Sequence, residues 1–107
     1  MKVPKIGCES HPMLNKRCII RTYSAGIHIG TVSWISADTS MEVALTDSLR
    51  LWEWKNGGLS LSAIANKGIR GGRIDRTEYV FLTNAIEYIP TTEEAESTFL
   101  RFIEDDK

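Results

Sequence analysis

The sequence predicts a single small α+β domain, in which a mainly antiparallel sheet of about five strands is joined by one short helix and a C-terminal amphipathic helix. The length of 107 residues is that of one ordinary domain, and 42% hydrophobic with 25% charged residues allows one modest core. Short runs of β-branched and aromatic residues alternate with turn residues along most of the chain, whereas a clear helical stripe occurs only near the C-terminus. These observations favour a sheet with few helices.

The first 15 residues differ from the rest because they lack a periodic pattern. Pro4, Gly7 and Pro12 interrupt this segment, and its charges are scattered. We expect residues 1–15 to form an extended or mobile N-terminal arm and residues 16–107 to form the domain.

Two runs of strand-forming residues follow, over residues 17–23 and 27–35. Gly26 between them can adopt the positive φ of a tight turn, so the two strands are predicted to form a hairpin. In the second run the apolar alternation slips by one residue around Gly30. A β-bulge at this glycine would explain the slip.

The next strands are expected over residues 41–46, where apolar and polar residues alternate, and over residues 49–55. Trp52 and Trp54 lie two residues apart, so we expect both on one face together with Arg50. That face would offer a stacking surface for a base or for an aromatic ring of a partner. The alternative is that one or both tryptophans fill the core.

A short helix is predicted next, with Ser60 as its N-cap and Gly68 as its terminator. Residues 67–76 then combine four basic residues with three glycines. We expect a basic flexible loop there, because free backbone N–H groups and arginine side chains suit phosphate or carboxylate recognition. An ordinary solvated loop is the competing interpretation.

Residues 78–82 and 85–89 are predicted as strands separated by a bend. The last element is a helix, for which Thr91 and Glu94 form a capping box. Its apolar stripe should pack on the sheet. The stripe consists of Ala95, Phe99, Phe102 and Ile103.

Charge and hydropathy exclude several broad classes of function. A formal net charge of -1 argues against general nucleic-acid binding, which normally requires an excess of Lys and Arg. No apolar run approaches the length of about 20 residues that a membrane-spanning helix needs, and residues 1–4 lack the apolar core of a secretion signal. We therefore expect a cytoplasmic protein. Because a domain of this size buries a limited surface, we also expect a homo-oligomer.

The soft metal ligands of the chain are its cysteines and histidines. Cys8 and His11 have the spacing of a zinc ligand pair, but Cys18 and His28 do not form a second tight pair. We therefore predict no metal, no cofactor and two free thiols.

Residues suited to catalysis are not grouped in the sequence. Only His11 and His28 could serve as an imidazole base, but His11 lies in the arm and Ser24 near His28 lacks the glycines of a nucleophile elbow. His28 is therefore interpreted as a surface residue of its strand. The pair Gly71-Gly72 fits neither a phosphate loop nor a dinucleotide motif. We expect a binding protein and not an enzyme.

Arginine and aromatic side chains are the best candidates for ligand binding. Guanidinium groups pair with phosphates through parallel hydrogen bonds, and aromatic rings stack on bases. Arg21, Arg50 and Arg73 are expected to contact phosphates. Tyr23 or one of the tryptophans is expected to stack on a base. The candidate set is Arg21, Tyr23, Ser24, His28, Arg50, Trp52, Trp54, Arg70 and Arg73.

Four segments carry a recognisable pattern, which is most specific in the Arg-Thr-Tyr-Ser-Ala-Gly string of residues 21–26. The segments are residues 19–30, 49–54, 73–74 and 82–90. Together they resemble a family of small bacteriophage proteins that is known mainly as a domain of unknown function, over about residues 18–96. Many members have Asn-Ala-Arg-Arg where this chain has Asp-Ser-Leu-Arg at residues 47–50, which weakens any role for an arginine pair.

The resemblance implies a phage source. Small phage proteins often block host defences, and some are oligomeric sponges, including those that counter Thoeris defence, which sequester cyclic nucleotide signals without cleaving them. It therefore implies a non-enzymatic protein of the host cytoplasm that binds an anionic small molecule such as a cyclic nucleotide. Two other functions stay open: a module that inhibits a host enzyme through the tryptophan-rich strand, and a minor virion component.

Overall fold

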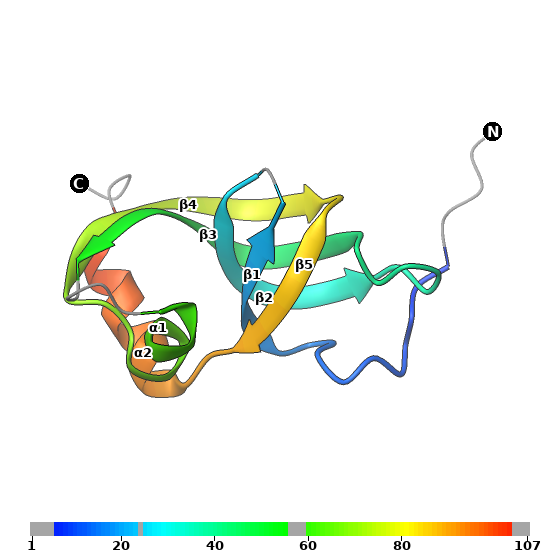
Figure 1. Cartoon of the computed structure of the whole chain (residues 1–107), viewed down its shortest axis with the longest axis horizontal. Coiled ribbons are helices and arrows are strands. Elements are labelled where there is room, and N and C mark those ends of the chain that lie inside the picture. Colours follow the sequence, from blue (N-terminus) through cyan, green and yellow to red (C-terminus); the bar gives the residue numbers. More distant parts are fainter. Residues whose placement is uncertain (1–5, 24, 56–59, 104–107) are drawn as a thin grey trace.

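The computed structural model describes residues 6–23, 25–55 and 60–103, and it has the predicted α+β architecture (Figure 1). Within these ranges, five antiparallel strands form one sheet, and two short helices lie at one end of it. In chain order the elements are β1 (Arg17–Thr22), β2 (Ile27–Ile35), β3 (Val43–Lys55), α1 (Leu61–Lys67), β4 (Gly71–Leu82), β5 (Ala85–Pro90), α2 (Glu93–Phe99) and the single 3₁₀ turn η1 (Leu100–Phe102).

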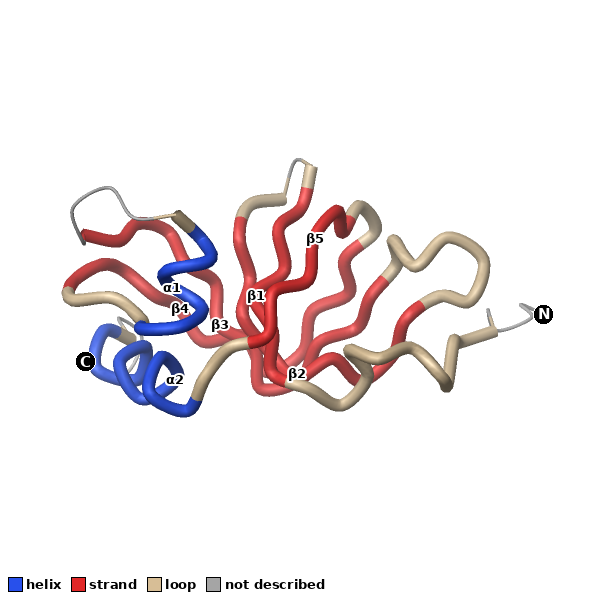
Figure 2. Tube along the Cα trace, turned by 60° about the horizontal axis from the view of Figure 1, so that its bottom comes forward, coloured by secondary structure: helices blue, strands red, loops and turns tan. Residues whose placement is uncertain are grey.

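The sheet has the strand order β4-β3-β2-β1-β5, and every neighbouring pair is antiparallel. The predicted hairpin of β1 and β2 is confirmed, and Gly26 between them has a φ of +87°. β3 and β4 form a long pair that extends beyond the other strands, and the two helices lie side by side near its end (Figure 2). This long pair is the element that carries the site described below.

Both faces of the sheet are buried where β1 crosses it. Ile19 belongs to a first core between the sheet and the helices, and Ile20, the next residue, belongs to a second core on the opposite face. A strand buried on both faces has no solvent side, which explains the continuous apolar run of β1. The first core consists of Ile19, Ile29, Leu49, Leu51, Ile64, Ala65, Ile69, Ile74, Ala95, Phe99 and Ile103. The second core consists of Cys18, Ile20, Val32, Ile35, Val43, Leu45, Leu82 and Ala85.

The predicted β-bulge of the second strand at Gly30 is wrong. The register between β2 and β3 does shift across Gly30, but Ile29 pairs with Leu49 and Thr31 with Thr46, so the extra residue lies on β3, and β2 pairs with β1 without a shift there. The bulge of β2 itself lies between Val32 and Trp34. A Cβ atom at Gly30 would lie 3.1 Å from the Cβ atoms of Leu45 and Ser48, so the two strands approach closely there. On β3, Asp47 adopts the left-handed conformation with a φ of +48°. The chain thereby continues as one long strand where the sequence predicts two.

The predicted basic loop over residues 67–76 is wrong for most of its length. β4 begins at Gly71, and it pairs with β3 so that Arg73 lies opposite Glu53. This pairing satisfies the backbone N–H and C=O groups that a loop would leave free. Gly72 is needed for the close approach of the strands, since a Cβ atom there would clash with the carbonyl oxygen of Glu53. Residues 68–70 alone connect α1 to β4.

The observed ends of α1 are those predicted from the sequence, whereas the N-cap of α2 lies one residue after the predicted one. Ser60 caps α1 and Gly68 ends it, as predicted. The predicted cap Thr91 is wrong, because the side chain of Thr92 accepts the hydrogen bond from the N–H group of Ala95. The Thr91 hydroxyl bonds instead to the backbone carbonyl of the first residue of β1.

Residues 6–15, the described part of the expected arm, run beside β2. The N–H groups of Cys8 and Asn15 donate to carbonyl oxygens of β2 at 2.7 and 2.6 Å. Met13 and Leu14 pack against the second core. The earlier residues of the arm lie outside the described part of the chain.

Candidate functional site

The two tryptophans of β3 lie on opposite faces of the sheet, so the shared face predicted from their spacing is wrong. Leu51 belongs to the first core and Trp54 packs against it, whereas Trp52 between them is 51% exposed. The register with β4 shifts between Leu51 and Glu53, and this bulge breaks the two-residue alternation. Trp52 is therefore accessible to a ligand, while Trp54 covers the core.

Trp52 is held at both the face and the edge of its ring. The guanidinium carbon of Arg50 lies 5.0 Å from the centre of the indole, which is within the range of a cation–π interaction. The indole N–H donates a hydrogen bond to the Asp75 carboxylate. Arg50 and Asp75 are partners in the register of β3 and β4, so the three side chains share one face. Arg50, Trp52 and Asp75 are termed the Trp52 surface below.

A hollow of about 310 Å³ lies between the Trp52 surface and the turn that joins β1 to β2. It is lined by Ala25, Gly26, Ile27, Arg50, Leu51 and Trp52. The Arg50 guanidinium donates to the carbonyl oxygen of Ala25 at 3.3 Å and so connects the turn to β3. The predicted turn and the predicted Arg50–Trp52 pair thus meet at one place.

His28 is buried next to this turn, so its predicted place on the surface is wrong. Its exposed fraction is 1%, and its Nε2 atom lies 3.0 Å from the carbonyl oxygen of Ala25. A carbonyl oxygen only accepts, so Nε2 carries the proton, and Nδ1 has no hydrogen-bond partner among the described residues. Burial lowers the pKa of His28 below its ordinary value of 6.5; the hydrogen bond to Ala25 opposes this effect, and the charge of Arg50 adds to it. His28 therefore holds the turn in place from the buried side, through its hydrogen bond to the Ala25 carbonyl oxygen.

Of the three arginines expected to meet phosphates, two share a face and one lies apart. Arg73 is exposed and lies two residues before Asp75 on β4, so both project on the same face. Arg21 forms an ion pair with Glu87 of β5 at 2.9 Å. Its partner in the register with β2 is Ile27, which packs against the first core. Arg21 therefore belongs to the face opposite the Trp52 surface.

The other candidates lie at the ends of elements. Tyr23 directly follows β1 and is 82% exposed, and Ser24 lies outside the described residues. Arg70 lies in the short connection between α1 and β4, on the side of the helices. The structure thus brings together Arg50, Trp52 and the buried His28, with Arg73 nearby on the same face.

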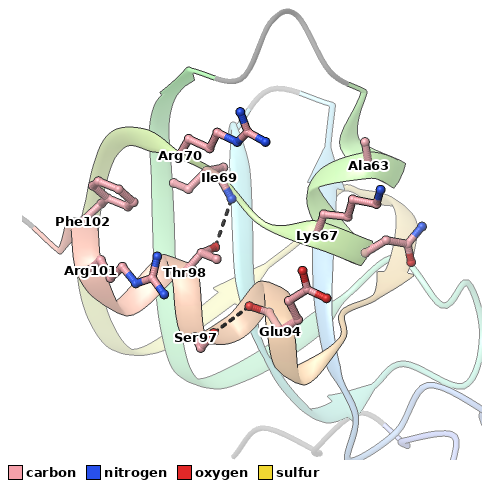
Figure 3. Close-up of a pocket in the computed structure, with 10 residues that line it drawn as sticks. Ala63, Lys67, Ile69, Arg70, Glu94, Ser97, Thr98, Arg101 and Phe102 are labelled. Carbon is pink, nitrogen blue, oxygen red and sulfur yellow. Dashed lines mark hydrogen bonds between the residues drawn. The ribbon is translucent and has the colours of Figure 1, made fainter.

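A second hollow, of about 930 Å³, lies between α1 and α2 (Figure 3). It is lined by Ala63, Asn66, Lys67, Ile69, Arg70, Glu94, Ser97, Thr98, Arg101 and Phe102, and is termed the interhelical hollow below. Of its three cationic residues, Arg70 is a sequence-based candidate, and Lys67 belongs to the basic segment noted in the sequence. Nothing in the sequence points to Arg101, because its proximity depends on how the C-terminal helix docks.

Residues 6–23, 25–55 and 60–103 contain no group of three or more His, Cys, Asp or Glu side chains that could hold a metal ion. No helix among them is long and apolar enough to cross a membrane. Cys8 and Cys18 are free thiols, and burial raises the pKa of Cys18 to about 11. The chemistry that the two hollows offer is ring stacking and pairing with anions.

Comparison with known proteins agrees with the resemblance to a domain of unknown function seen in the sequence. Residues 15–99 match the family model described as a domain of unknown function (DUF6948). A search of curated proteins and a search of solved structures found no significant match. Because the matched region includes all five described strands together with α1 and α2, the chain belongs to the DUF6948 family.

Proposed function

We propose that the chain is a non-enzymatic binding protein that sequesters a nucleotide-type ligand at the Trp52 surface. One observation carries the proposal: a half-exposed indole, fixed by Arg50 and Asp75, borders a hollow of about 310 Å³. A flat base can stack on such a ring, and stacking on an aromatic side chain is worth about 1–3 kcal/mol per base.

The fixed position of Trp52 favours binding because little side-chain freedom is left to lose when a ligand arrives. Arg50 uses one of its N–H groups on Ala25, and a guanidinium has five such groups. Arg73 adds a second positive charge to the same face, while Asp75 contributes a negative one. A ligand that combines a planar ring with an anionic group would complement these side chains.

The resemblance of residues 21–26 to small phage proteins supports a phage source and a task in the host cytoplasm. In that setting, a protein that binds a cyclic nucleotide without cleaving it would withdraw a host defence signal, as the sponges that counter Thoeris defence do. Within this segment, Arg21 and Thr22 end β1, and Ala25 and Gly26 line the hollow beside the Trp52 surface. The segment with the most specific resemblance therefore borders the proposed site.

The protein is further proposed to act as a homo-oligomer through the free edge of β4. This strand lies at one edge of the sheet, and its Tyr79 and Phe81 side chains are 55% and 48% exposed. An edge strand with exposed aromatic residues is a template for pairing with a second copy. The other edge strand, β5, ends in Pro90, which has no N–H group to offer a partner.

Equilibrium dialysis against a panel of cyclic nucleotides, followed by heating and chromatography of the released ligand, tests the proposal. We expect uptake of at least one nucleotide and its release intact. Trp52→Leu should weaken the binding by roughly fivefold to hundredfold, as expected from the loss of about 1–3 kcal/mol of stacking. Ile86→Ala, an exposed apolar residue of β5, is the matched control and should bind normally. No uptake by the wild type, release of cleaved products, or equal losses in both variants would each contradict the proposal.

A second candidate is a protein-binding module that inhibits a host enzyme. It is favoured by the exposed aromatic side chains of Trp52, Tyr79 and Phe81, since aromatic anchors dominate many protein interfaces. Affinity purification from a host lysate should then recover one stoichiometric protein with the wild type and lose it with Trp52→Ala. Retention by the variant would exclude this surface. A third candidate, a minor virion component, would show as a stoichiometric band in purified particles.

A further inference from the structure

We propose that the interhelical hollow is a second binding site, which takes a small organic anion bearing a phosphate group. The hollow lies beside the two helices (Figure 3). Trp52 projects from the face of β3 opposite the core that the helices cover. Its volume of about 930 Å³ falls within the range of about 300–1,000 Å³ that is usual for small-molecule sites. The site is separate from the one in the proposed function.

Three cations from three segments border this hollow. Lys67 comes from the last turn of α1, Arg70 from the connection to β4, and Arg101 from η1. Figure 3 shows their charged ends on different sides of the hollow. Of the lining residues, Glu94 alone is acidic. The excess of positive charge favours an anion that carries more than one negative charge.

These three cations have no protein partner among the described residues, in contrast to Arg17 and Arg21. Arg17 pairs with Glu96 and Arg21 pairs with Glu87, each at 2.9 Å. By contrast, within the described part of the chain the side chains at positions 67, 70 and 101 form no ion pair and no hydrogen bond. Lys67 and Arg101 have an ordinary structural explanation, because each lies in the last turn of its helix and a cation stabilises the C-terminal end of a helix. Arg70 has none.

The walls of the hollow are fixed by hydrogen bonds between the segments that form it. The Thr98 hydroxyl accepts from the N–H group of Ile69 at 3.0 Å and donates to the carbonyl oxygen of Ala95 at 2.7 Å. At the other end, the Thr92 hydroxyl donates to the carbonyl oxygen of Asn66 at 2.7 Å. The backbone that carries Arg70 is thus attached to α2 before a ligand binds. A preformed site lowers the entropy cost of binding.

The lining also indicates the kind of anion. Two guanidinium groups can each pair with a phosphate through parallel hydrogen bonds, and the ammonium group of Lys67 adds a point charge. Ile69, Ala63 and the half-buried Phe102 supply an apolar part of the wall. This combination suits an organic phosphate, whose charged groups pair with cations around the hollow while its carbon skeleton contacts the apolar wall.

Titration of the ¹⁵N-labelled full-length protein with inorganic pyrophosphate, at constant ionic strength, tests the proposal by NMR. We expect saturable shifts of backbone signals in residues 67–70 and 98–101. Arg70→Gln and Arg101→Gln should each weaken binding by about tenfold to hundredfold, which is the usual contribution of a charge-assisted hydrogen bond. Glu94→Gln should strengthen binding, because it removes the acidic residue of the lining.

Arg21→Gln is the matched control, since it removes the same charge from a distant exposed ion pair and should leave the affinity unchanged. Trp52→Leu should also bind pyrophosphate normally, which separates this site from the one in the proposed function. No saturable shift, shifts centred elsewhere, or equal losses in Arg21→Gln and Arg70→Gln would overturn the proposal. Citrate in place of pyrophosphate should bind more weakly, and tighter binding of citrate would overturn the assignment to phosphate.

Discussion

Replacing Gly68 with alanine should destabilise the protein strongly. Gly68 ends α1 with a φ of 86° and a ψ of -160°, a conformation that costs a residue with a side chain about 1–3 kcal/mol. Its new Cβ atom would also overlap the Thr98 hydroxyl and lie 2.8 Å from Thr98 Cγ2, and such overpacking costs about 1–3 kcal/mol. The expected loss of roughly 2–6 kcal/mol is a large share of the 5–15 kcal/mol or so that stabilises a typical domain.

Gly26→Ala is the control for this substitution. Gly26 has nearly the same φ, +87°, but nothing lies within 4 Å of the position of its Cβ atom, so only a conformational cost of about 1–2 kcal/mol is expected. Urea denaturation gives the free energy of unfolding of each variant. In a Thr98→Ala background, the cost of Gly68→Ala should shrink because the two nearest overlapping atoms, the hydroxyl oxygen and Cγ2 of Thr98, are gone. Equal costs for the two glycine variants, or an unchanged cost in the Thr98→Ala background, would refute the reasoning.

Three further predictions concern ionisable groups. Glu96→Gln should lower the free energy of unfolding by about 1–3 kcal/mol, because this largely buried carboxylate accepts two hydrogen bonds from Arg17. The Glu87 carboxylate is half-exposed, so Glu87→Gln should cost less than about 1 kcal/mol in the same urea titration. Since folding lowers the pKa of His28, its stabilising contribution is complete above pH 6.5 and is lost as the pH falls from there through the folded pKa. Urea unfolding at neutral and acidic pH should show a smaller pH dependence for His28→Leu than for the wild type, and identical dependences would exclude this linkage. Finally, Ellman's reagent at mildly alkaline pH should modify Cys8 well before Cys18 in the folded protein. Burial shields the Cys18 thiol and raises its pKa to about 11, so little reactive thiolate forms. Equal rates for the two thiols would contradict this prediction and would mean that the second core opens readily.

The fold could be predicted from the sequence where a local signal decides the structure. Gly26 marks a turn because glycine adopts a positive φ without strain, which is a property of the residue itself. The start of β4 could not be predicted in this way, because Gly71 and Gly72 have the composition of a loop. They become strand through pairing with β3, a segment far away in the sequence. Local composition cannot indicate such a partner.

In the candidate site, too, local sequence predicts some features, while others depend on contacts between distant segments. Arg50 and Trp52 share a face because they lie two residues apart on a strand, so this pair could be predicted. The same rule fails for Trp54, because a bulge intervenes and its position depends on the pairing with β4. The interhelical hollow could not be predicted at all, since Arg70 and Arg101 meet only when α2 docks on α1.

The arrangement of charges supports the proposal that a chain with a formal net charge of -1 binds anions. Arg17 and Arg21 are paired with carboxylates and attract little from outside, whereas Arg70 and Arg101 border a hollow and have no protein partner in the described part of the chain. Charges interact over about 8 Å at physiological salt, so a small anion inside the hollow senses mainly the local cations. A long nucleic acid would instead extend beyond the hollow, over a chain that has no net excess of positive charge. Under the two proposals the ligands are compact anions, and increasing salt should weaken binding in the interhelical hollow more than ring stacking on Trp52.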